Sequence, residues 1–469
     1  MSCGPGAVWP PSAWGMIETH NPATGELLAR YEETSPEAVI AAIEAADGAQ
    51  QVWAQTDLAE RAIPMRRFAE ILEERIEPLA ELMADEMGKP LAQGRGEVEK
   101  CAWVCRHYAD EAPRILADEH YEVDRKKSYT AWRPMGIVLA VMPWNFPLWQ
   151  VIRFVAPALM AGNAGLLKHA SNVTGTALAI DEMVTAAGFP DGLFRTLVLP
   201  ARRVDEVLEH PLVRAATLTG SDPAGRAVAS KAGSLLKKTV LELGGSDPYL
   251  VLADADIDLA ASSCATSRLI NGGQSCVAAK RFIVDRTVVD EFTEKLIANL
   301  TTAVVGDPKD PNTTLGPLAR TDLRDELHDQ VVRSVRDGAE LLLGGEVPDE
   351  PGSYYPPTVL GSVTEGMAVY HEETFGPVAT IIPVDGQEEA IEVANSSEFG
   401  LGAGVFTRDE ALGESIARDR LEAGNCFVNS FVASDPRLPF GGVKMSGYGR
   451  ELSDLGMREF MNAKTVVVT

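Results

Sequence analysis

From Gly136 onward, short apolar runs alternate with stretches of helical periodicity, and this alternation constrains the fold more than any other feature. The apolar runs are Ile137–Val141, Leu166–Lys168, Thr196–Leu199, Ala215–Thr219 and Thr239–Leu243. The helical stretches between them include Ala177–Ala187, Val204–Glu209 and Pro223–Ala232. Such alternation is typical of a parallel sheet with helices on both faces. Parallel sheets bind ligands at the carboxyl ends of their strands, so polar motifs that follow these runs are candidate sites.

A second alternating block begins at Tyr249–Leu252 and runs through Cys426–Asn429. Gly245, near the boundary, lies between two chemical motifs, which predicts an active site in a cleft between two domains. Before the first block, Ser35 and Pro36 are typical of a helix start. A longer helical region is expected over Leu58–Met87.

The overall charge and the cysteines exclude several classes of function. The formal net charge of -26 argues against nucleic acid or anionic membranes as partners. Six cysteines without a recognisable secretion signal predict a cytoplasmic protein with reduced thiols. Cys101 and Cys105 lie one helical turn apart but lack a second Cys/His pair, so no metal site is expected. Residues 1–15 carry no charge and three prolines, and we expect a disordered extension there.

The sharpest chemical motif is Asn271-Gly272-Gly273-Gln274-Ser275-Cys276. Two glycines allow the backbone to bend tightly before the cysteine. A cysteine presented in this way is a candidate nucleophile where its thiolate is favoured. The competing interpretation is a buried structural cysteine, which is the commoner role of a free cysteine.

Two further motifs follow predicted strands. In Leu241-Glu242-Leu243-Gly244-Gly245, burial would raise the pKa of Glu242 and suit it to general-base catalysis. The alternative is a carboxylate that faces solvent at a sheet edge. In Pro143-Trp144-Asn145-Phe146-Pro147, the amide of Asn145 can donate to a developing oxyanion, unless it only completes a turn.

Together, these three motifs resemble the aldehyde dehydrogenase superfamily in order and nearly letter for letter. Further matches are Thr219-Gly220-Ser221, Glu372–Pro377 and Pro439–Lys444, and the resemblance extends from about Met16 to the last residue. It implies that Cys276 is the nucleophile, Glu242 the base and Asn145 the oxyanion donor. The implied reaction passes through a hemithioacetal and a thioester on Cys276.

The resemblance also implies an α/β fold in three parts. Residues 16–125 and 137–245 would form a Rossmann-like NAD(P)-binding domain, and residues 246–432 an α/β catalytic domain. Residues 126–136 and 433–469 would form a small β oligomerisation element. We expect its hairpin near Lys126–Met135 to join a terminal strand, Thr465–Thr469, that pairs across subunits of a homodimer or homotetramer.

Cofactor-binding roles are implied for Trp144, Asn145, Lys168, Ser171, Gly220, Ser221, Leu243, Glu373 and Phe375. Ser171 stands where NAD-preferring relatives often carry glutamate. Without that negative charge, Lys168 and Ser171 can both donate to a 2′-phosphate, so NADP is expected over NAD. Ser221 begins a helix whose N-terminus favours a phosphate. The alternatives are a solvated lysine and two helix-capping serines.

Several stretches, including Val141–Arg153 and Gly273–Arg281, resemble bacterial succinate-semialdehyde dehydrogenases. A carboxylate at the far end of the aldehyde requires a cation or several donors. The resemblance assigns this role to Arg153, Ser275 and Ser434. Arg153 could instead pair with an acidic neighbour, and Ser434 could be an ordinary loop serine.

The chain departs at two positions from the pattern of the family that it resembles. Ile270 replaces a second substrate arginine found in some relatives, and Arg268 is two positions away from that place. Ala278 replaces a second cysteine, so no redox switch is expected there. The alternatives to succinate semialdehyde are glutarate semialdehyde or another short aldehyde. A non-catalytic binding protein and a thioesterase that uses the same cysteine without a dinucleotide are the alternatives outside this reaction.

Overall fold

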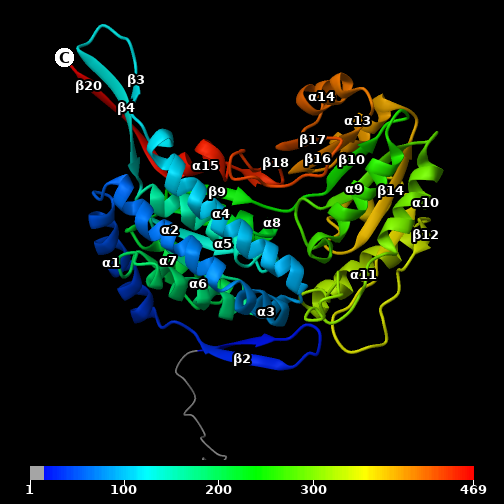
Figure 1. Cartoon of the computed structure of the whole chain (residues 1–469), viewed down its shortest axis with the longest axis horizontal. Coiled ribbons are helices and arrows are strands. Elements are labelled where there is room, and N and C mark those ends of the chain that lie inside the picture. The colour runs from blue at the N-terminus through cyan, green and yellow to red at the C-terminus, as the bar shows by residue number, and fades with distance from the viewer. Residues whose placement is uncertain (1–14) are drawn as a thin grey trace, which may run out of the picture.

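A computed structural model describes residues 15–469, which form two lobes, each built on its own sheet (Figure 1). The expected disordered extension, residues 1–15, lies outside the described residues except for Gly15. Within residues 15–469, no helix is long and apolar enough to cross a membrane. The same residues contain no group of three or more His, Cys, Asp or Glu that could hold a metal ion.

The sheet of the first lobe has six strands in the order β19-β9-β8-β5-β6-β7. Its strands are β5 (Ile137–Met142), β6 (Ala164–His169), β7 (Phe194–Thr196), β8 (Val213–Thr219), β9 (Lys238–Glu242) and β19 (Gly447–Tyr448). The five strands predicted from the apolar runs pair in parallel, which confirms the expected α/β fold. β19 pairs antiparallel with β9, and its two residues gave no strand pattern in the sequence.

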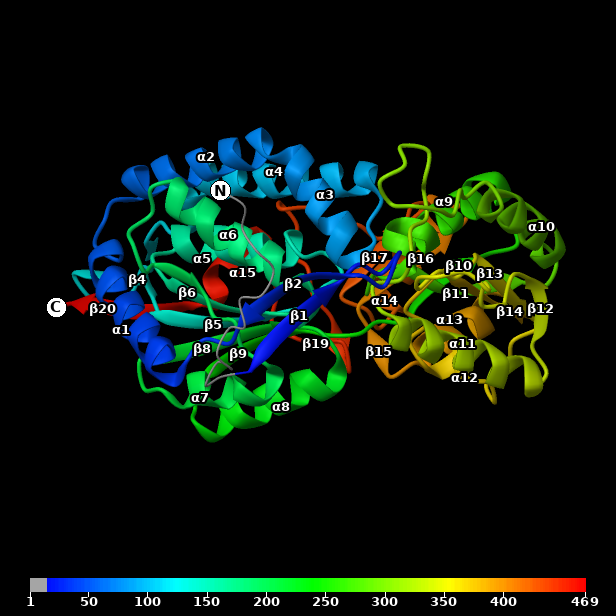
Figure 2. The ribbon, with the colours of Figure 1, turned by 90° about the horizontal axis from the view of Figure 1, so that it is seen from below.

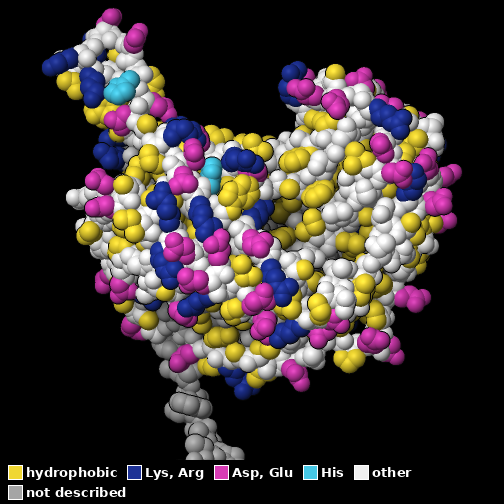
Figure 3. Space-filling model, in the orientation of Figure 1, with side chains coloured by type: hydrophobic (Ala, Val, Ile, Leu, Met, Phe, Trp, Pro, Cys, Tyr) yellow, Lys and Arg dark blue, Asp and Glu magenta, His cyan; other side chains and the backbone are white. Residues whose placement is uncertain are grey.

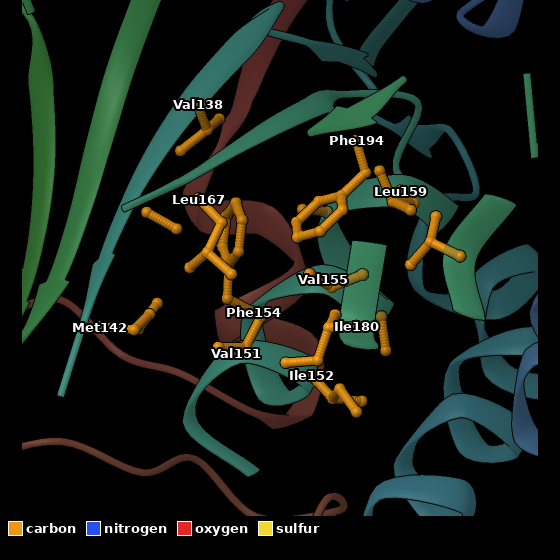
Figure 4. Close-up of a cluster of buried hydrophobic side chains, with 14 of the residues drawn as sticks. Val138, Met142, Val151, Ile152, Phe154, Val155, Leu159, Leu167, Ile180 and Phe194 are labelled. Atoms are coloured by element: carbon orange, nitrogen blue, oxygen red, sulfur yellow. The ribbon is translucent and has the colours of Figure 1, made fainter. Parts of the chain in front are cut away.

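Helices cover both faces of this sheet, as Figure 2 shows, with α2, α4 and α6 on one side and α7 and α8 on the other. The helices of this lobe are α1 (Pro36–Trp53), α2 (Leu58–Glu74), α3 (Ile76–Met87), α4 (Leu91–Ile115), α5 (Trp149–Met160), α6 (Thr174–Ala186), α7 (Val204–Glu209), α8 (Asp222–Ser234) and α15 (Ser453–Glu459). The core between β5, β6 and α5 consists of interlocked aliphatic and aromatic side chains, including Val138, Leu167, Val155 and Phe154 (Figure 4). This packing fixes the strand ends that carry the polar motifs.

Two local details of the helices follow from the sequence. The Ser35 hydroxyl accepts the N–H of Ala38, and Pro36 occupies the first helical position, as predicted. The region Leu58–Met87 is not one helix, because Arg75 has φ -112° and ψ 19° between α2 and α3. Pro78 lacks an N–H and is tolerated in the first turn of a helix, so a new helix begins just before it.

The sheet of the second lobe has seven strands in the order β12-β13-β14-β11-β10-β16-β17. Its strands are β10 (Asp247–Val251), β11 (Ala279–Asp285), β12 (Glu340–Leu343), β13 (Thr358–Gly361), β14 (Val378–Val384), β16 (Gly402–Phe406) and β17 (Asn425–Val428). Its helices are α9 (Ile257–Leu269), α10 (Val289–Leu300), α11 (Thr321–Arg336), α12 (Ala368–His371), α13 (Gln387–Asn395) and α14 (Glu410–Asp419). Only the edge strand β12 runs antiparallel within the described sheet.

Two antiparallel ribbons extend the lobes. At one end, β20 (Met461–Val468) pairs with β4 (Lys127–Pro134), which also pairs with β3 (Glu119–His120), and this ribbon projects from the body in Figure 1. The terminal strand thus begins at Met461 rather than Thr465. The hairpin of β1 (Met16–His20) and β2 (Leu27–Glu32) lies along the bottom of the molecule in Figure 1 and faces the viewer in Figure 2.

Residues 433–460 do not join the projecting ribbon and run back between the lobes. β18 (Val443–Lys444) pairs with β15 (Phe399–Gly400) of the second lobe, and β19 pairs with β9 of the first lobe. This segment therefore contacts both sheets on its way to β20. It also brings Gly441 and Glu451 to the end of β9, where Glu242 lies.

Candidate active site

A cavity of about 300 Å³ lies between the lobes and includes Cys276 in its wall. Its lining comes from α4 and α5 of the first lobe, from the Cys276 loop and from residues 431–440. Figure 3 shows that the molecular surface is hollowed between the two lobes. Cys276 follows the short 3-10 helix η3 (Ile270–Gly273) and precedes β11. The predicted nucleophile therefore lies in an interlobe cleft.

The Cys276 loop bends through left-handed backbone conformations. The φ angles are 56° at Asn271, 65° at Gly272 and 74° at Gly273. A Cβ on Gly273 would lie 2.3 Å from the carbonyl oxygen of Gly376, so only glycine fits there. The glycines thus allow both the bend and the close approach of a neighbouring loop.

Side chains hold all four carbonyls from residue 273 to residue 276. Arg268 Nη2 donates to the Gly273 oxygen at 2.6 Å, and Asn145 Nδ2 donates to the Gln274 oxygen at 3.1 Å. Lys280 Nζ donates to the oxygens of Ser275 at 3.0 Å and Cys276 at 2.8 Å. The Cys276 N–H has no hydrogen-bond partner within residues 15–469. These contacts restrain the loop and leave the Cys276 N–H free beside the sulfur.

Arg268 and Lys280 had different signals in the sequence. Arg268 lies two positions from the place of the second substrate arginine. The structure buries it fully in α9, from where its guanidinium donates to the Cys276 loop. Lys280 was not predicted. A lysine in the apolar stretch that forms β11 was the available signal, because a buried lysine normally has a specific partner.

Burial controls the protonation of Cys276. It raises the pKa of the thiol to about 12, although the positive charges of Lys280 and Arg153 oppose the shift. The resting thiol is therefore neutral near pH 7.

Glu242 ends β9 and is buried, which excludes the solvent-facing alternative. Burial raises its pKa well above the usual range, and the neighbouring Glu451 carboxylate adds to the shift. Neither carboxylate oxygen has a hydrogen-bond partner within residues 15–469. A Cβ on Gly441 would lie 2.7 Å from Glu242 Oε1, so a glycine leaves room for this side chain. Glu242 does not line the 300 Å³ cavity that contains Cys276.

Asn145 follows β5 and faces the Cys276 loop through its amide. Its Nδ2 atom uses one N–H on the Gln274 oxygen and retains a second. Its backbone oxygen accepts from Lys89 Nζ at 3.0 Å and from Asn271 Nδ2 at 2.7 Å. These contacts hold Asn145, the predicted oxyanion donor, against the loop that carries Cys276.

A buried ion pair, which the sequence did not reveal, anchors this region. Lys89 pairs with Glu97, whose Oε1 accepts the N–H groups of Leu148 and Trp149, both at 2.9 Å. These N–H groups belong to the start of α5, which carries Arg153. The pair thus fixes the segment between Asn145 and Arg153.

A second cavity, of about 780 Å³, contains Lys168, Ser171 and Ser221 in its lining. Lys168 is buried and has neither an ion-pair nor a hydrogen-bond partner within the described chain; burial lowers its pKa. Ser221 precedes the first residue of the 13-residue helix α8 and makes no side-chain capping bond. An unpaired amine and a free helix N-terminus fit the phosphates of a dinucleotide.

The other residues expected to bind the cofactor come from both lobes. Glu373 accepts the Gly245 N–H at 3.0 Å and pairs with Lys280 at 3.3 Å. The rings of Trp144 and Phe375 meet edge to face, with centroids 5.7 Å apart. The Gly220 N–H donates to the backbone oxygen of Glu242 at 3.0 Å, at the end of the pairing between β8 and β9. Leu243 packs against α8, where a Cβ on Gly225 would lie 2.5 Å from it.

The expected substrate residues Arg153, Ser275 and Ser434 all line the 300 Å³ cavity, as does Ile270. Arg153 is only 2% exposed and forms an ion pair with Glu451, which is the alternative that the sequence left open. Its guanidinium also lies over the Phe440 ring, 5.0 Å from the centroid. Ser434 Oγ accepts a hydrogen bond from Lys100 Nζ at 2.8 Å. Ser434 is therefore a member of a polar pair rather than an isolated loop serine.

Known proteins are similar to this chain over nearly its full length. The model described as "Aldehyde dehydrogenase family" matches residues 9–466. A Mycobacterium bovis protein named "Succinate-semialdehyde dehydrogenase [NADP(+)] 1" is 48% identical over 453 residues, which cover 96% of this chain and 99% of the relative. A Synechocystis protein named "Probable succinate-semialdehyde dehydrogenase [NADP(+)]" is also 48% identical, over 450 residues and the same shares of both chains.

Solved structures agree with these relatives. The succinic semialdehyde dehydrogenase of Streptococcus pyogenes, solved with NADP+ as the cofactor, matches with a TM-score of 0.94 and 39% identity. The match covers 96% of this chain and 99% of the other. Fold and sequence similarity therefore extend over both lobes.

Proposed function

The chain belongs to the aldehyde dehydrogenase family, and we propose that it oxidises succinate semialdehyde to succinate with NADP+ as the electron acceptor. The observation that carries this proposal is the position of Cys276 in the wall of a cavity that also contains cationic side chains. Hydrogen bonds to its carbonyl groups hold the Cys276 loop in place. The names of the relatives and the NADP+ of the S. pyogenes structure support the same assignment.

The first half of the reaction forms a covalent intermediate on the chain. Cys276 Sγ releases its proton to solvent, and the resulting thiolate attacks the aldehyde carbon, so that the carbonyl oxygen becomes an oxyanion. The second N–H of Asn145 and the free N–H of Cys276 are the donors available to that oxygen. A bound oxidised nicotinamide would supply the acceptor for the hydride that leaves the hemithioacetal carbon. Cys276 is then left as a thioester.

The second half of the reaction regenerates the thiol. Water attacks the thioester carbon, and Glu242 accepts a proton of that water. The C–S bond then breaks, the carboxylic acid leaves, and the Cys276 thiolate takes the proton back from Glu242. A glutamate with a raised pKa is well suited to this role because its proton affinity lies closer to neutrality.

The proposal is tested by steady-state rates with succinate semialdehyde, glutarate semialdehyde and propanal, each with NADP+ and with NAD+. We expect the highest kcat/KM for succinate semialdehyde with NADP+. A protein that hydrolyses thioesters at full rate without a dinucleotide would contradict the proposal. Higher kcat/KM for propanal than for both acidic aldehydes would leave the reaction intact and remove the substrate assignment.

The preference for NADP depends on the absence of negative charge at position 171. Replacing Ser171 by glutamate places a carboxylate in the cavity that Lys168 lines. Repulsion from the 2′-phosphate should lower kcat/KM for NADP+ about ten- to a hundredfold, while NAD+ gains relative to it. The measurement is the ratio of the two kcat/KM values. Ser171→Ala is the matched control and should cost only a few-fold with NADP+, since it removes one donor without adding charge. An unchanged ratio in Ser171→Glu would mean that this residue does not face the 2′-phosphate.

We also propose that the protein is a cytoplasmic homodimer or homotetramer. β20 forms one edge of the projecting ribbon, and Val467 and Val468 on it are 50% and 41% exposed. An exposed edge strand with apolar side chains favours pairing with another strand. Sedimentation of the wild-type protein tests the assembly.

A further inference from the structure

The charged side chains in the substrate cavity are not equivalent, because most of them are already neutralised. The lining contains Lys89, Glu97, Lys100 and Arg153. Lys89 pairs with Glu97, and Arg153 pairs with Glu451, which lies behind the cavity wall. These three cations and two carboxylates leave one positive charge. That charge belongs to Lys100, which has no ion pair within residues 15–469.

Lys100 is held in place by two groups that do not cancel its charge. Its Nζ atom donates to Ser434 Oγ at 2.8 Å and lies 4.4 Å from the centroid of the Trp149 ring. The ammonium group has three N–H donors, so donors remain after the bond to Ser434. The Ser434 hydroxyl accepts from Lys100, which leaves its own proton free to be donated. Lys100 and Ser434 thus offer neighbouring donors to one anionic group.

The surroundings of Lys100 favour an incoming anion. Partial burial, together with the charge of Arg153, lowers the pKa of Lys100 to about 8, although the nearby carboxylates of Glu97 and Asp435 oppose the shift. The ammonium group is therefore poorly solvated. A carboxylate would compensate for that lost solvation. Ile270, Phe431 and Phe440 form apolar parts of the same wall and suit a short methylene chain between the two ends of a substrate.

We propose that Lys100, together with Ser434, binds the far carboxylate of the substrate and supplies the positive charge that Ile270 does not. This inference rests on the proposed function, because it names the residue that recognises the acidic end of the aldehyde. Cys276 holds the aldehyde carbon at one part of the cavity wall, and the Lys100–Ser434 pair holds the carboxylate at another. Arg153, paired with Glu451, contributes to the local field.

The test compares Lys100→Met with the wild-type protein on succinate semialdehyde and on propanal. Methionine keeps the approximate length and apolar stem of lysine but removes its charge. We expect KM for succinate semialdehyde to rise about ten- to a hundredfold with kcat changed less than about threefold, as expected for a charged hydrogen bond. KM for propanal should stay within about twofold, and Lys100→Arg should recover most of the loss. Lys295→Met, on the outer helix α10, is the matched control and should change neither KM.

A second measurement separates carboxylate binding from turnover of the acidic aldehyde. Succinate should inhibit propanal oxidation by the wild-type protein, and its inhibition constant should rise about ten- to a hundredfold in Lys100→Met. Equal changes for both aldehydes, or an unchanged inhibition constant, would overturn the role of Lys100. A wild-type protein that does not prefer acidic aldehydes to propanal would instead overturn the proposed substrate.

Discussion

Cys276→Ala is expected to reduce kcat/KM for aldehyde oxidation by about 10⁴-fold or more, because no other group can form the thioester. The substitution removes the sulfur and leaves the carbonyl contacts of the loop to Arg268, Asn145 and Lys280 in place. The measurement is NADPH formation with succinate semialdehyde.

The same variant has an internal control. Its thermal unfolding midpoint and its affinity for NADP+ should remain close to those of the wild-type protein, since neither depends on the sulfur. An alkylating aldehyde analogue should label Cys276 in the wild-type protein. The peptide that contains position 276 should stay unlabelled in the variant. Residual activity above about one per cent would show that Cys276 is not the nucleophile, because covalent catalysis cannot survive that loss.

Glu242→Gln is expected to stop the reaction at the thioester. Glutamine has nearly the same size but cannot accept a proton from water, so hydrolysis should slow by about 10²- to 10⁴-fold. Mixing the variant with substrate and NADP+ should give a burst of about one NADPH per active site, followed by slow turnover. Mass spectrometry should then find the acyl group on the peptide that contains Cys276.

The direction in which the rate of thioester hydrolysis changes with pH is a second test of Glu242. Burial raises the pKa of Glu242, and only its ionised form is a base. The wild-type hydrolysis rate should therefore increase as pH rises through that pKa, and the increase should be absent in Glu242→Gln. The variant would contradict the assignment if it lacked the burst, or if it turned over with the wild-type rate and pH profile.

Much of the fold followed from local patterns in the sequence. The five apolar runs of the first block correspond to β5, β6, β7, β8 and β9, because strands covered on both faces are continuously apolar. β7 lies earlier in the chain than predicted. It ends at Thr196, where the predicted run begins, because the following residues lead to Pro200 and leave the sheet. β19 and β18 could not be predicted, because two-residue strands are defined by their partners and not by their own sequence.

The site was predictable where chemistry is confined to one motif and unpredictable where it depends on distant partners. Asn145, Glu242 and Cys276 each stand in a short motif at a strand end or tight loop. The pairing of Arg153 with Glu451 joins residues about 300 positions apart, and nothing local to either residue indicates it. Lys100 was not predicted for the same reason. Its proposed role depends on Ser434, 334 residues away, and on the ion pairs that neutralise the other cations of the cavity.

Glu242 and Cys276 are carried by different lobes, since β9 belongs to the first sheet and the Cys276 loop leads into β11 of the second. The direct covalent link between them passes through Gly244 and Gly245, whose missing Cβ atoms leave space for Glu373, Cys276 and Leu401. The packing at these two glycines therefore helps to set how far apart the predicted base and the predicted nucleophile lie. The spacing of the catalytic pair thus depends on a stretch of backbone to which neither side chain belongs.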